Sequence, residues 1–306
     1  MRRLFLATAT LFVALGLAAR FWLWRPMGEG PAGPSLAREG WDHRWTDRPV
    51  LVVGLGDSVT TGFGASPGMS YFERLSRSPA TDSADMRGLD LAQVIPRLRT
   101  TNLAMSGCTT RQALKAQLPK LGRHPDSIFG IVTITLGGND LIHNYGSSPP
   151  VEDAMYGATW EQAQPWIGRF GERLDRLLAD IESAFPGGCW IFIGSIYDPS
   201  DGTGSLLTVG LPPWRDGLRI HAEYNRTLKK TASRHPTCTV VDIHGAFLGH
   251  GITCRQFWRP TYRSDDPTWW YHSNVEDPND RGYDAILRLF LAAISDRAKT
   301  KGWRID

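Results

Sequence analysis

Residues 50–64 read VLVVGLGDSVTTGFG. An apolar run ends abruptly at Gly56-Asp57-Ser58, a sequence that is also common in ordinary turns. Glycine lets the backbone turn sharply, so a serine between a strand and a helix can present its hydroxyl and its own N–H together. Gly54-Leu55-Gly56 also begins a dinucleotide fingerprint, but the third glycine would fall on Val59, which excludes that motif. The stretch predicts a buried strand that ends in a nucleophile, Ser58.

The rest of the chain alternates short apolar runs with longer helical patterns. The apolar runs lack clean alternation of polar and apolar residues, which is typical of strands buried on both faces of a parallel sheet. We therefore predict an α/β fold, a five-stranded parallel sheet covered by helices, and no second domain. The predicted strands are 50–56, 99–104, 130–137, 189–196 and 238–243, and the predicted helices are 70–77, 109–121, 165–185, 216–234 and 278–298.

The composition narrows the function classes. With 42% hydrophobic and 21% charged residues, the 306-residue chain can bury a substantial core. The net charge is only +3, and four arginines lie in the N-terminal segment, so the body is close to neutral. The chain has no basic run interleaved with aromatic residues, and this argues against nucleic acid as a partner.

The four cysteines show neither a CxxC motif nor Cys/His pairs at zinc spacing, so no metal site is predicted. Cys189 and Cys238 each open a predicted strand. They would lie within disulfide reach if these strands were neighbours, and two buried thiols are the alternative.

The N-terminal segment, residues 1–25, has the pattern of a targeting sequence. Two arginines precede Leu4–Ala19, sixteen residues without a charge, which predicts an export signal. The alternative is an uncleaved membrane anchor with Trp22 and Trp24 at the headgroups, although sixteen residues are fewer than the ~20 needed to span a bilayer. A buried helix is the third interpretation. Both leading interpretations predict a periplasmic or extracellular protein, anchored in the second case. Residues 26–48 are predicted to be a linker or arm, and residues 49–306 the folded domain.

Two further strand ends carry candidate site residues. Gly107 follows the second predicted strand and precedes a helix, a position where a backbone N–H can face an anion; a tight turn would explain this glycine as well. The third strand ends in Gly137-Gly138-Asn139-Asp140. Asn139 can aim its amide at an oxyanion, or it can be an ordinary turn residue.

Together these blocks resemble the SGNH (GDSL-type) hydrolase family. Gly56-Asp57-Ser58 is similar to its first block, Gly107 to its second, Gly138-Asn139-Asp140 to its third, and residues 277–283 to its last. The resemblance covers about residues 49–295. It implies a flavodoxin-like three-layer α/β/α sandwich with Ser58 as nucleophile. It also implies an oxyanion hole made by the N–H groups of Ser58 and Gly107 and the side chain of Asn139.

The catalytic base departs from the family pattern. The family carries Asp-x-x-His in its last block, and the matching positions here are Asn274 and Asp277. Asp277 precedes Pro278, which is typical of a helix N-cap with proline at the first helical position. Asp277 could instead act as the base if burial raises its pKa. His272, in the same loop, is the other candidate, and further alternatives are His143, His244 and His250.

The predicted loops after the third, fourth and fifth strands are long: 140–164, 197–215 and 244–277. They carry five tryptophans, which predict a lid, an apolar or sugar-binding wall, or plain loop packing. These are Trp160, Trp214, Trp258, Trp269 and Trp270.

The predicted function is a serine hydrolase without metal or organic cofactor. It would cleave an acyl or acetyl ester of a carbohydrate or lipid through an acyl-enzyme. An O-acyltransferase with the same nucleophile is the closest alternative. A catalytically inactive module that binds a glycan is the alternative from a different class, because both members of the family's Asp-x-x-His pair are replaced.

Overall fold

The computed structural model describes the backbone of residues 2–303 and the side chains of residues 8–303. Its centre is a fully parallel sheet with the strand order β2-β1-β3-β4-β5. β1 lies between β2 and β3, so the chain reverses direction across the sheet beside β1, and ligands of such sheets bind at this switch point. The predicted α/β fold is confirmed, with strand bounds within two residues of prediction: β1 Val50–Gly56, β2 Leu98–Asn102, β3 Phe129–Thr135, β4 Cys189–Gly194 and β5 Cys238–Val241.

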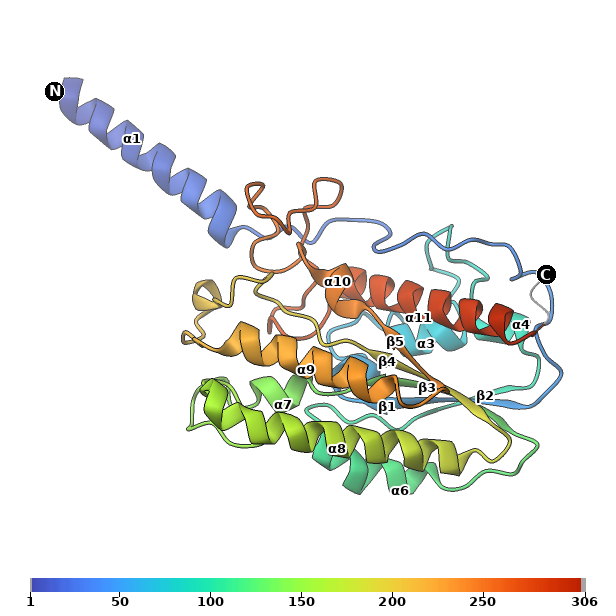
Figure 1. Cartoon of the computed structure of the whole chain (residues 1–306). Coiled ribbons are helices and arrows are strands. Elements are labelled where there is room, and N and C mark those ends of the chain that lie inside the picture. Colours follow the sequence, from blue (N-terminus) through green and yellow to red (C-terminus); the bar gives the residue numbers. More distant parts are fainter. Residues whose placement is uncertain (1, 304–306) are drawn as a thin grey trace.

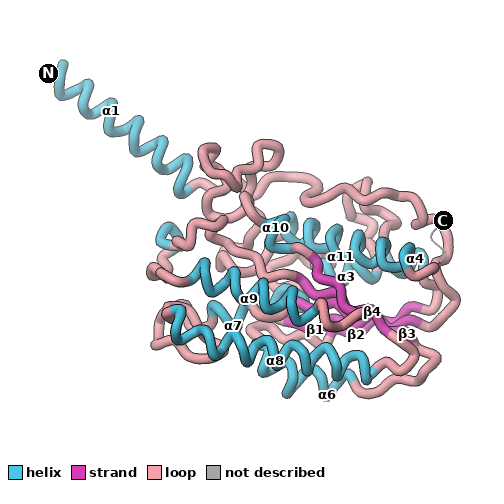
Figure 2. Tube along the Cα trace, viewed as in Figure 1, coloured by secondary structure: helices cyan, strands magenta, loops and turns pink. Residues whose placement is uncertain are grey.

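Helices cover both faces of the sheet and make three layers (Figure 1). The consecutive β1 side chains Val52 and Val53 point into different hydrophobic clusters, one on each face of the sheet. The Val52 cluster includes α3 and α11, and the Val53 cluster includes α8 and α9. The tube view shows the strands enclosed between these layers (Figure 2). The longer helices are α3 Tyr71–Ser76, α8 Trp160–Ala184, α9 Gly217–Ala232 and α11 Asp280–Thr300.

Shorter elements complete the layers. The helix predicted over 109–121 forms as three consecutive pieces, with a π-helical turn, η2, between α5 and α6. The short elements are α2 Ser58–Thr61, α4 Leu91–Val94, α5 Thr110–Gln112, η2 Ala113–Gln117, α6 Leu118–Leu121, α7 Gly138–Ile142, η3 Leu207–Val209 and α10 Ile243–Phe247.

α11 begins later than the proline pattern predicts. Its N-cap is Asn279, whose Oδ1 accepts from the backbone N–H groups of Arg281 and Gly282. The interpretation of Asp277 as the N-cap is therefore wrong. The carboxyl of Asp277 caps no helix, so it remains available for other contacts.

Residues 26–48 form an extended arm that packs along the body. Trp41 and Trp45 belong to the hydrophobic cluster that includes α11, and the backbone N–H of Ala32 donates to Oδ2 of Asp284 in that helix over 2.9 Å. The arm is therefore part of the folded core.

The N-terminal helix α1, Arg2–Ala18, projects from the body and continues into the π-helical turn η1, Ala19–Leu23 (Figure 1). None of the helices described within residues 2–303 is both long and apolar enough to cross a membrane. The export signal and the membrane anchor both stay predictions.

Cys189 and Cys238 lie on neighbouring strands but form no disulfide. β4 and β5 pair with Ile191 opposite Cys238, and all four cysteines are free thiols. Burial raises the pKa of Cys189 and of Cys238 to about 12, so both thiols stay protonated and unreactive at neutral pH.

Candidate active site

Ser58 lies at the carboxyl end of β1, where the chain passes directly into the short helix α2. Gly56 has φ +150°, and a Cβ there would lie 2.6 Å from the carbonyl oxygen of Thr135, so only glycine fits this turn. Asp57 caps α2 by accepting from the N–H of Val59 over 3.1 Å. The backbone N–H of Ser58 donates to no acceptor in the described part of the chain.

Asp57 is buried beside Ser58 and is held by β3. Its Oδ1 accepts from the hydroxyl of Thr135 over 2.9 Å, and Thr135 in turn contacts the hydroxyl of Thr60 at 2.7 Å. Burial raises the pKa of Asp57 to about 7, and the negative charge of Asp277 adds to this rise. Two carboxyl groups thus lie close to the candidate nucleophile.

A tight hairpin positions Asn274 and Asp277. The N–H of His272 donates to the carbonyl of Asp277 over 2.6 Å, and the N–H of Asn279 donates to the carbonyl of Trp270 over 2.9 Å. Within this hairpin, Nδ2 of Asn274 donates to Oδ2 of Asp277 over 2.6 Å. The backbone N–H of Asp277 returns a bond to Oδ1 of Asn274 over 3.2 Å.

The carboxyl of Asp277 faces Ser58. Asp277 is only 2% exposed. Burial raises its pKa above the ordinary value, and hydrogen bonding to Ser58 and Asn274 offsets part of the rise by stabilising the ionised form. Its Oδ1 atom is buried and has no partner at full hydrogen-bond geometry among the described residues. Asp277 therefore offers one buried carboxylate oxygen beside the Ser58 hydroxyl.

A long hydrogen bond joins Asn139 to Cys108, the residue after Gly107. Nδ2 of Asn139 donates to the carbonyl of Cys108 over 3.4 Å, and the hydroxyl of Ser106 meets that of Thr61 at 2.9 Å. Gly107, with φ +75°, lies between these two contacts, and its N–H donates to no acceptor in the described part of the chain. The loop after β2 thus brings an unpaired N–H next to α2 and Asn139.

His272 lies on the outer side of the hairpin. Its ring packs edge-on to Phe63 with 5.8 Å between centroids, and a Cβ at Gly64 would lie 3.0 Å from it. It lines an open hollow beside the N-terminal segment and does not line the cavity that contains Ser58. The structure brings Ser58, Asn139 and Asp277 together in one cavity and places His272 outside it.

The other histidines named from the sequence lie elsewhere. His250 stacks on Trp270 at 3.5 Å, and burial lowers its pKa to about 4. His244 packs against His221 at 4.9 Å. His143 approaches Gly107, where a Cβ would lie 3.8 Å from its Cε1 atom. None of the three lines the cavity around Ser58.

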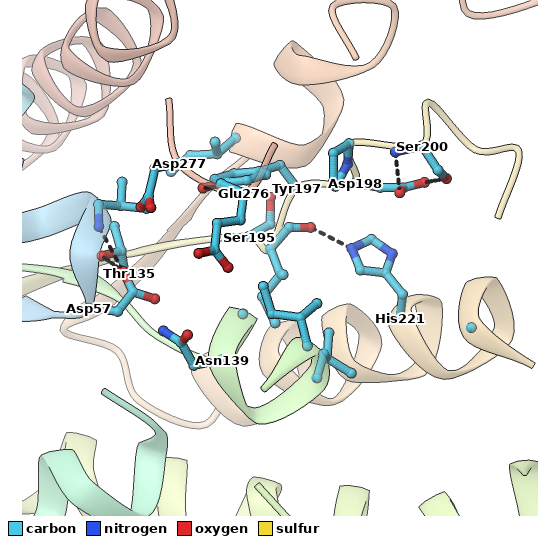
Figure 3. Close-up of a pocket in the computed structure, with 18 of the residues that line it drawn as sticks. Asp57, Thr135, Asn139, Ser195, Tyr197, Asp198, Ser200, His221, Glu276 and Asp277 are labelled. Atoms are coloured by element: carbon cyan, nitrogen blue, oxygen red, sulfur yellow. Dashed lines mark hydrogen bonds between the residues drawn. The ribbon is translucent and has the colours of Figure 1, made fainter. Parts of the chain in front are cut away.

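The cavity extends from Ser58 towards the start of α9 (Figure 3). Figure 3 shows Asp57 and Asp277 towards one end of it and His221 towards the other. Its volume is about 130 Å³, close to that of the ~150 Å³ apolar cavity that binds benzene in another protein. Most of the wall beyond the carboxyl groups is apolar: Leu136, Leu141, Ile142, Tyr156, Ile196, Leu206, Trp214, Leu218 and Ile243.

Glu276 is a cavity residue that the sequence pattern did not reveal. Its carboxyl accepts from the hydroxyl of Tyr145, and its backbone carbonyl accepts from the hydroxyl of Tyr197. These bonds tie the hairpin to the loops after β3 and β4. The only available signal was its place between Asn274 and Asp277, because Glu276 belongs to none of the matched blocks.

The tryptophans of the long loops do not form a common wall. Trp214 lines the cavity, whereas Trp269 and Trp270 are buried in the core. Trp258 contacts aromatic residues of the N-terminal segment, and Trp160 lies under Arg219 at 3.8 Å. Of the five tryptophans from which a lid or sugar-binding wall was predicted, Trp214 alone lines the described cavity.

Known structures of similar fold are lipases and esterases. An extracellular lipase from Streptomyces rimosus is 21% identical, with a TM-score of 0.55 over 80% of this chain and 99% of that chain. The lipase Lip_vut3 from a goat rumen metagenome is 18% identical, with a TM-score of 0.51 over 84% and 100%. A variant of Axe2, an acetyl-xylooligosaccharide esterase from Geobacillus, is 19% identical, with a TM-score of 0.50 over 82% and 96%. At these identities the likeness shows the fold.

No curated protein sequence matches the chain. The model of the GDSL-like Lipase/Acylhydrolase family matches residues 55–285, which include Ser58, Gly107, Asn139 and Asp277. This match covers most of the chain and confirms the predicted family. The protein therefore belongs to the GDSL-like lipase and acylhydrolase family and is an ester-hydrolysing enzyme.

Proposed function

We propose that the protein is a serine esterase in which the carboxylate of Asp277 takes the place of the usual imidazole base. One observation carries this proposal: Asp277 is buried against Ser58, is oriented by Asn274, and caps no helix. Burial supplies the property that the base needs, because it raises the pKa of the carboxyl and so makes the carboxylate more basic.

The chemistry proceeds in two steps of acyl transfer. As Oγ of Ser58 attacks the ester carbonyl carbon, its proton passes to the carboxylate of Asp277. The new carboxylic acid then gives this proton to the departing alcohol oxygen, which leaves an acyl-enzyme. In the second step Asp277 takes a proton from water, the water oxygen attacks the acyl carbon, and the proton returns to Oγ of Ser58.

The negative charge of each tetrahedral intermediate needs donors. The N–H groups of Ser58 and Gly107 make no other hydrogen bond among the described residues, and Nδ2 of Asn139 makes only a long one, of 3.4 Å. Donors that are unsatisfied in the resting enzyme can bind the oxyanion without first breaking other bonds. Each such donor typically contributes about 3–4 kcal/mol in the transition state.

The cavity favours an acyl group of moderate length. Its walls beyond the two carboxyl groups are mainly aliphatic and aromatic, and its volume is about 130 Å³. Because benzene fits a cavity of ~150 Å³, the space accommodates about six carbon atoms. This supports esters of short to medium acyl chains over an acetyl group alone. A glycan-binding role has less support, because only Trp214 of the five loop tryptophans lines the cavity.

A fluorophosphonate probe tests the proposal directly, because it labels only activated serines. We expect wild-type protein to be labelled and Ser58→Ala not to be labelled. Asp277→Asn should slow labelling by about 10²–10⁴-fold, the usual contribution of a positioned base. The matched control is His272→Ala, in the same hairpin, which should be labelled at the wild-type rate because the His272–Asp277 bond uses backbone atoms.

The variants separate two kinds of failure. An unlabelled wild-type protein would contradict the nucleophile itself. Slow labelling of His272→Ala together with normal labelling of Asp277→Asn would assign the base to the histidine and refute the carboxylate mechanism. Circular dichroism of each variant shows whether the fold is retained.

A further inference from the structure

An aromatic cluster joins the N-terminal segment to the long loop before α11. The ring of Phe21 lies 5.8 Å from that of Phe257 and 5.0 Å from that of Trp258. Trp22 contacts Trp258 at 5.5 Å, and Nε2 of Gln256 donates to the carbonyl of Phe21. Figure 1 shows the base of α1 meeting this loop at one corner of the body. The two segments form one surface.

Much of this aromatic surface faces solvent. Trp24 is 52% exposed, Trp258 45% and Phe257 62%, values that are unusual for such large apolar side chains outside binding sites. Leu23 and Met27 are exposed beside them. We call Phe21, Trp22, Trp24, Phe257 and Trp258 the aromatic patch.

Arginines surround the aromatic patch. The guanidinium of Arg255 lies 4.9 Å from the ring of Trp24, and that of Arg20 lies 5.6 Å from it. Arg25 follows Trp24 and Arg259 follows Trp258 in the chain, and the next acidic residues along these two segments are Glu29 and Asp265. The surface therefore combines exposed aromatic rings with several arginines.

The aromatic patch is connected to the wall of the catalytic cavity. Nη2 of Arg25 donates to Oγ1 of Thr208 over 2.8 Å. Leu206, two residues earlier, lines the cavity, and Leu207 between them is 60% exposed. A surface that binds the patch would therefore also lie close to this part of the cavity wall.

We propose that the aromatic patch docks on the surface of an anionic lipid bilayer and delivers lipid esters to the cavity. Tryptophan rings prefer the level of the headgroups, and arginines pair with lipid phosphates. Each basic residue near an anionic membrane adds to the attraction between the protein and the membrane surface. The part of this proposal that concerns lipid esters rests on the proposed esterase function, whereas the docking itself does not.

A second copy of the chain fits this surface less well. A symmetric dimer through the aromatic patch would bring the arginines of two copies face to face. Like charges that face each other across an interface repel and weaken it. An anionic lipid surface supplies the missing negative charge.

The test measures binding of the full-length Ser58→Ala protein to sedimented vesicles, so that lipid hydrolysis does not interfere. Vesicles of phosphatidylcholine alone are compared with vesicles in which about 30 mol% of the lipid is the anionic phosphatidylglycerol. We expect binding to the anionic vesicles and at least tenfold weaker binding in 0.5 M NaCl, on the order of one unit in log affinity, because salt screens surface charges.

Two variants locate the docking surface. Phe257→Ser with Trp258→Ser, and separately Arg255→Gln with Arg259→Gln, should each weaken vesicle binding at least tenfold. The matched control is Arg176→Gln with Arg226→Gln, because both arginines are highly exposed on α8 and α9. The control should bind like the parent protein. In the active background, all three variants should keep wild-type rates on a water-soluble short-chain ester.

Several outcomes would overturn the docking proposal. One is equal binding by patch and control variants, which would assign any vesicle binding to α1 alone. Another is a dimer in sedimentation analysis that the patch variants dissociate, without vesicle binding, which would assign the surface to a second copy. If the wild-type protein does not hydrolyse the soluble ester, the esterase proposal is contradicted and the docking result is unaffected.

Discussion

Asn274 donates a hydrogen bond from its amide to the carboxylate of Asp277 over 2.6 Å. In the Asp-x-x-His pair that the resemblance implies, the donor is the second residue and the acceptor is the first. Here the amide donor is first and the carboxylate acceptor is second. The pair keeps one orienting bond but reverses its direction, so that a carboxylate and not an imidazole faces Ser58.

Removing the orienting amide should weaken catalysis without removing the base. For Asn274→Ala we expect kcat to fall about 10–100-fold, on the scale of one hydrogen bond to a charged group. The pKa of Asp277 should rise further, because one of the bonds that stabilise its charged form is lost. The pH–rate profile would therefore move to higher pH. Unchanged pH dependence with reduced kcat would indicate a purely structural role for Asn274.

The pH dependence distinguishes the two candidate bases. A carboxylate base must be ionised, so kcat/KM should rise with pH through the pKa of Asp277, which burial raises above its ordinary value of 3.8. The same limb should remain in His272→Ala. Disappearance of the limb in that variant would identify the imidazole as the titrating group.

The oxyanion donors can be tested at Asn139. Asn139→Ala should lower kcat about 10²–10³-fold on an activated short-chain ester, with little change in KM, because the amide acts on charge that develops in the transition state. The melting temperature is the control, since the side chain of Asn139 makes only a long hydrogen bond of 3.4 Å. Activity close to that of wild type would place the oxyanion elsewhere.

Restoring the family pair tests whether the rest of the site is competent. The double variant Asn274→Asp with Asp277→His should hydrolyse esters with a pH limb near ~6.5, the ordinary pKa of imidazole. The single variant Asp277→His is the control, because it lacks the orienting carboxylate. Inactivity of the double variant, with the fold intact by circular dichroism, would show that the surrounding loops fit only the native pair.

Asp57 should make stability depend on pH. Its pKa in the folded protein is about 7 against an ordinary value of 3.8. Between about pH 4 and pH 7, the carboxyl of Asp57 therefore holds a proton in the folded state that it has lost in the unfolded state. The stabilisation is fully present below about pH 4 and disappears as the pH rises to about 7, a loss on the order of a few kcal/mol. Urea unfolding of wild type and Asp57→Asn between these pH values should show a declining difference. A constant difference would contradict the raised pKa.

Strand positions could be predicted from the sequence because a buried parallel strand leaves a local signal, an unbroken apolar run. The five predicted strands agree with the structure within two residues at each end. Helix starts depend on capping and were less accurate. α8 begins at Trp160 because Thr159 and Gln162 form a capping box, and it continues through Pro165, the predicted start of this helix.

The residues around Ser58 were only partly predictable, for a different reason. Glycine turns at strand ends are local features, and they led to Ser58, Gly107 and Asn139. The environment of Asp277 depends on a hairpin closed by backbone bonds and on the N-cap falling two residues later, at Asn279. Neither feature has a signature in residues 274–277, the positions that match the family's Asp-x-x-His.

The packed arm has a consequence for the order of folding. Ala32 bonds to Asp284, 252 positions later in the chain, and closing so long a loop is entropically costly until the intervening sheet has formed. A chain emerging from the ribosome cannot make this contact before α11 has been synthesised. We therefore expect the part of the arm around Ala32 to dock last, after the C-terminal helix is complete.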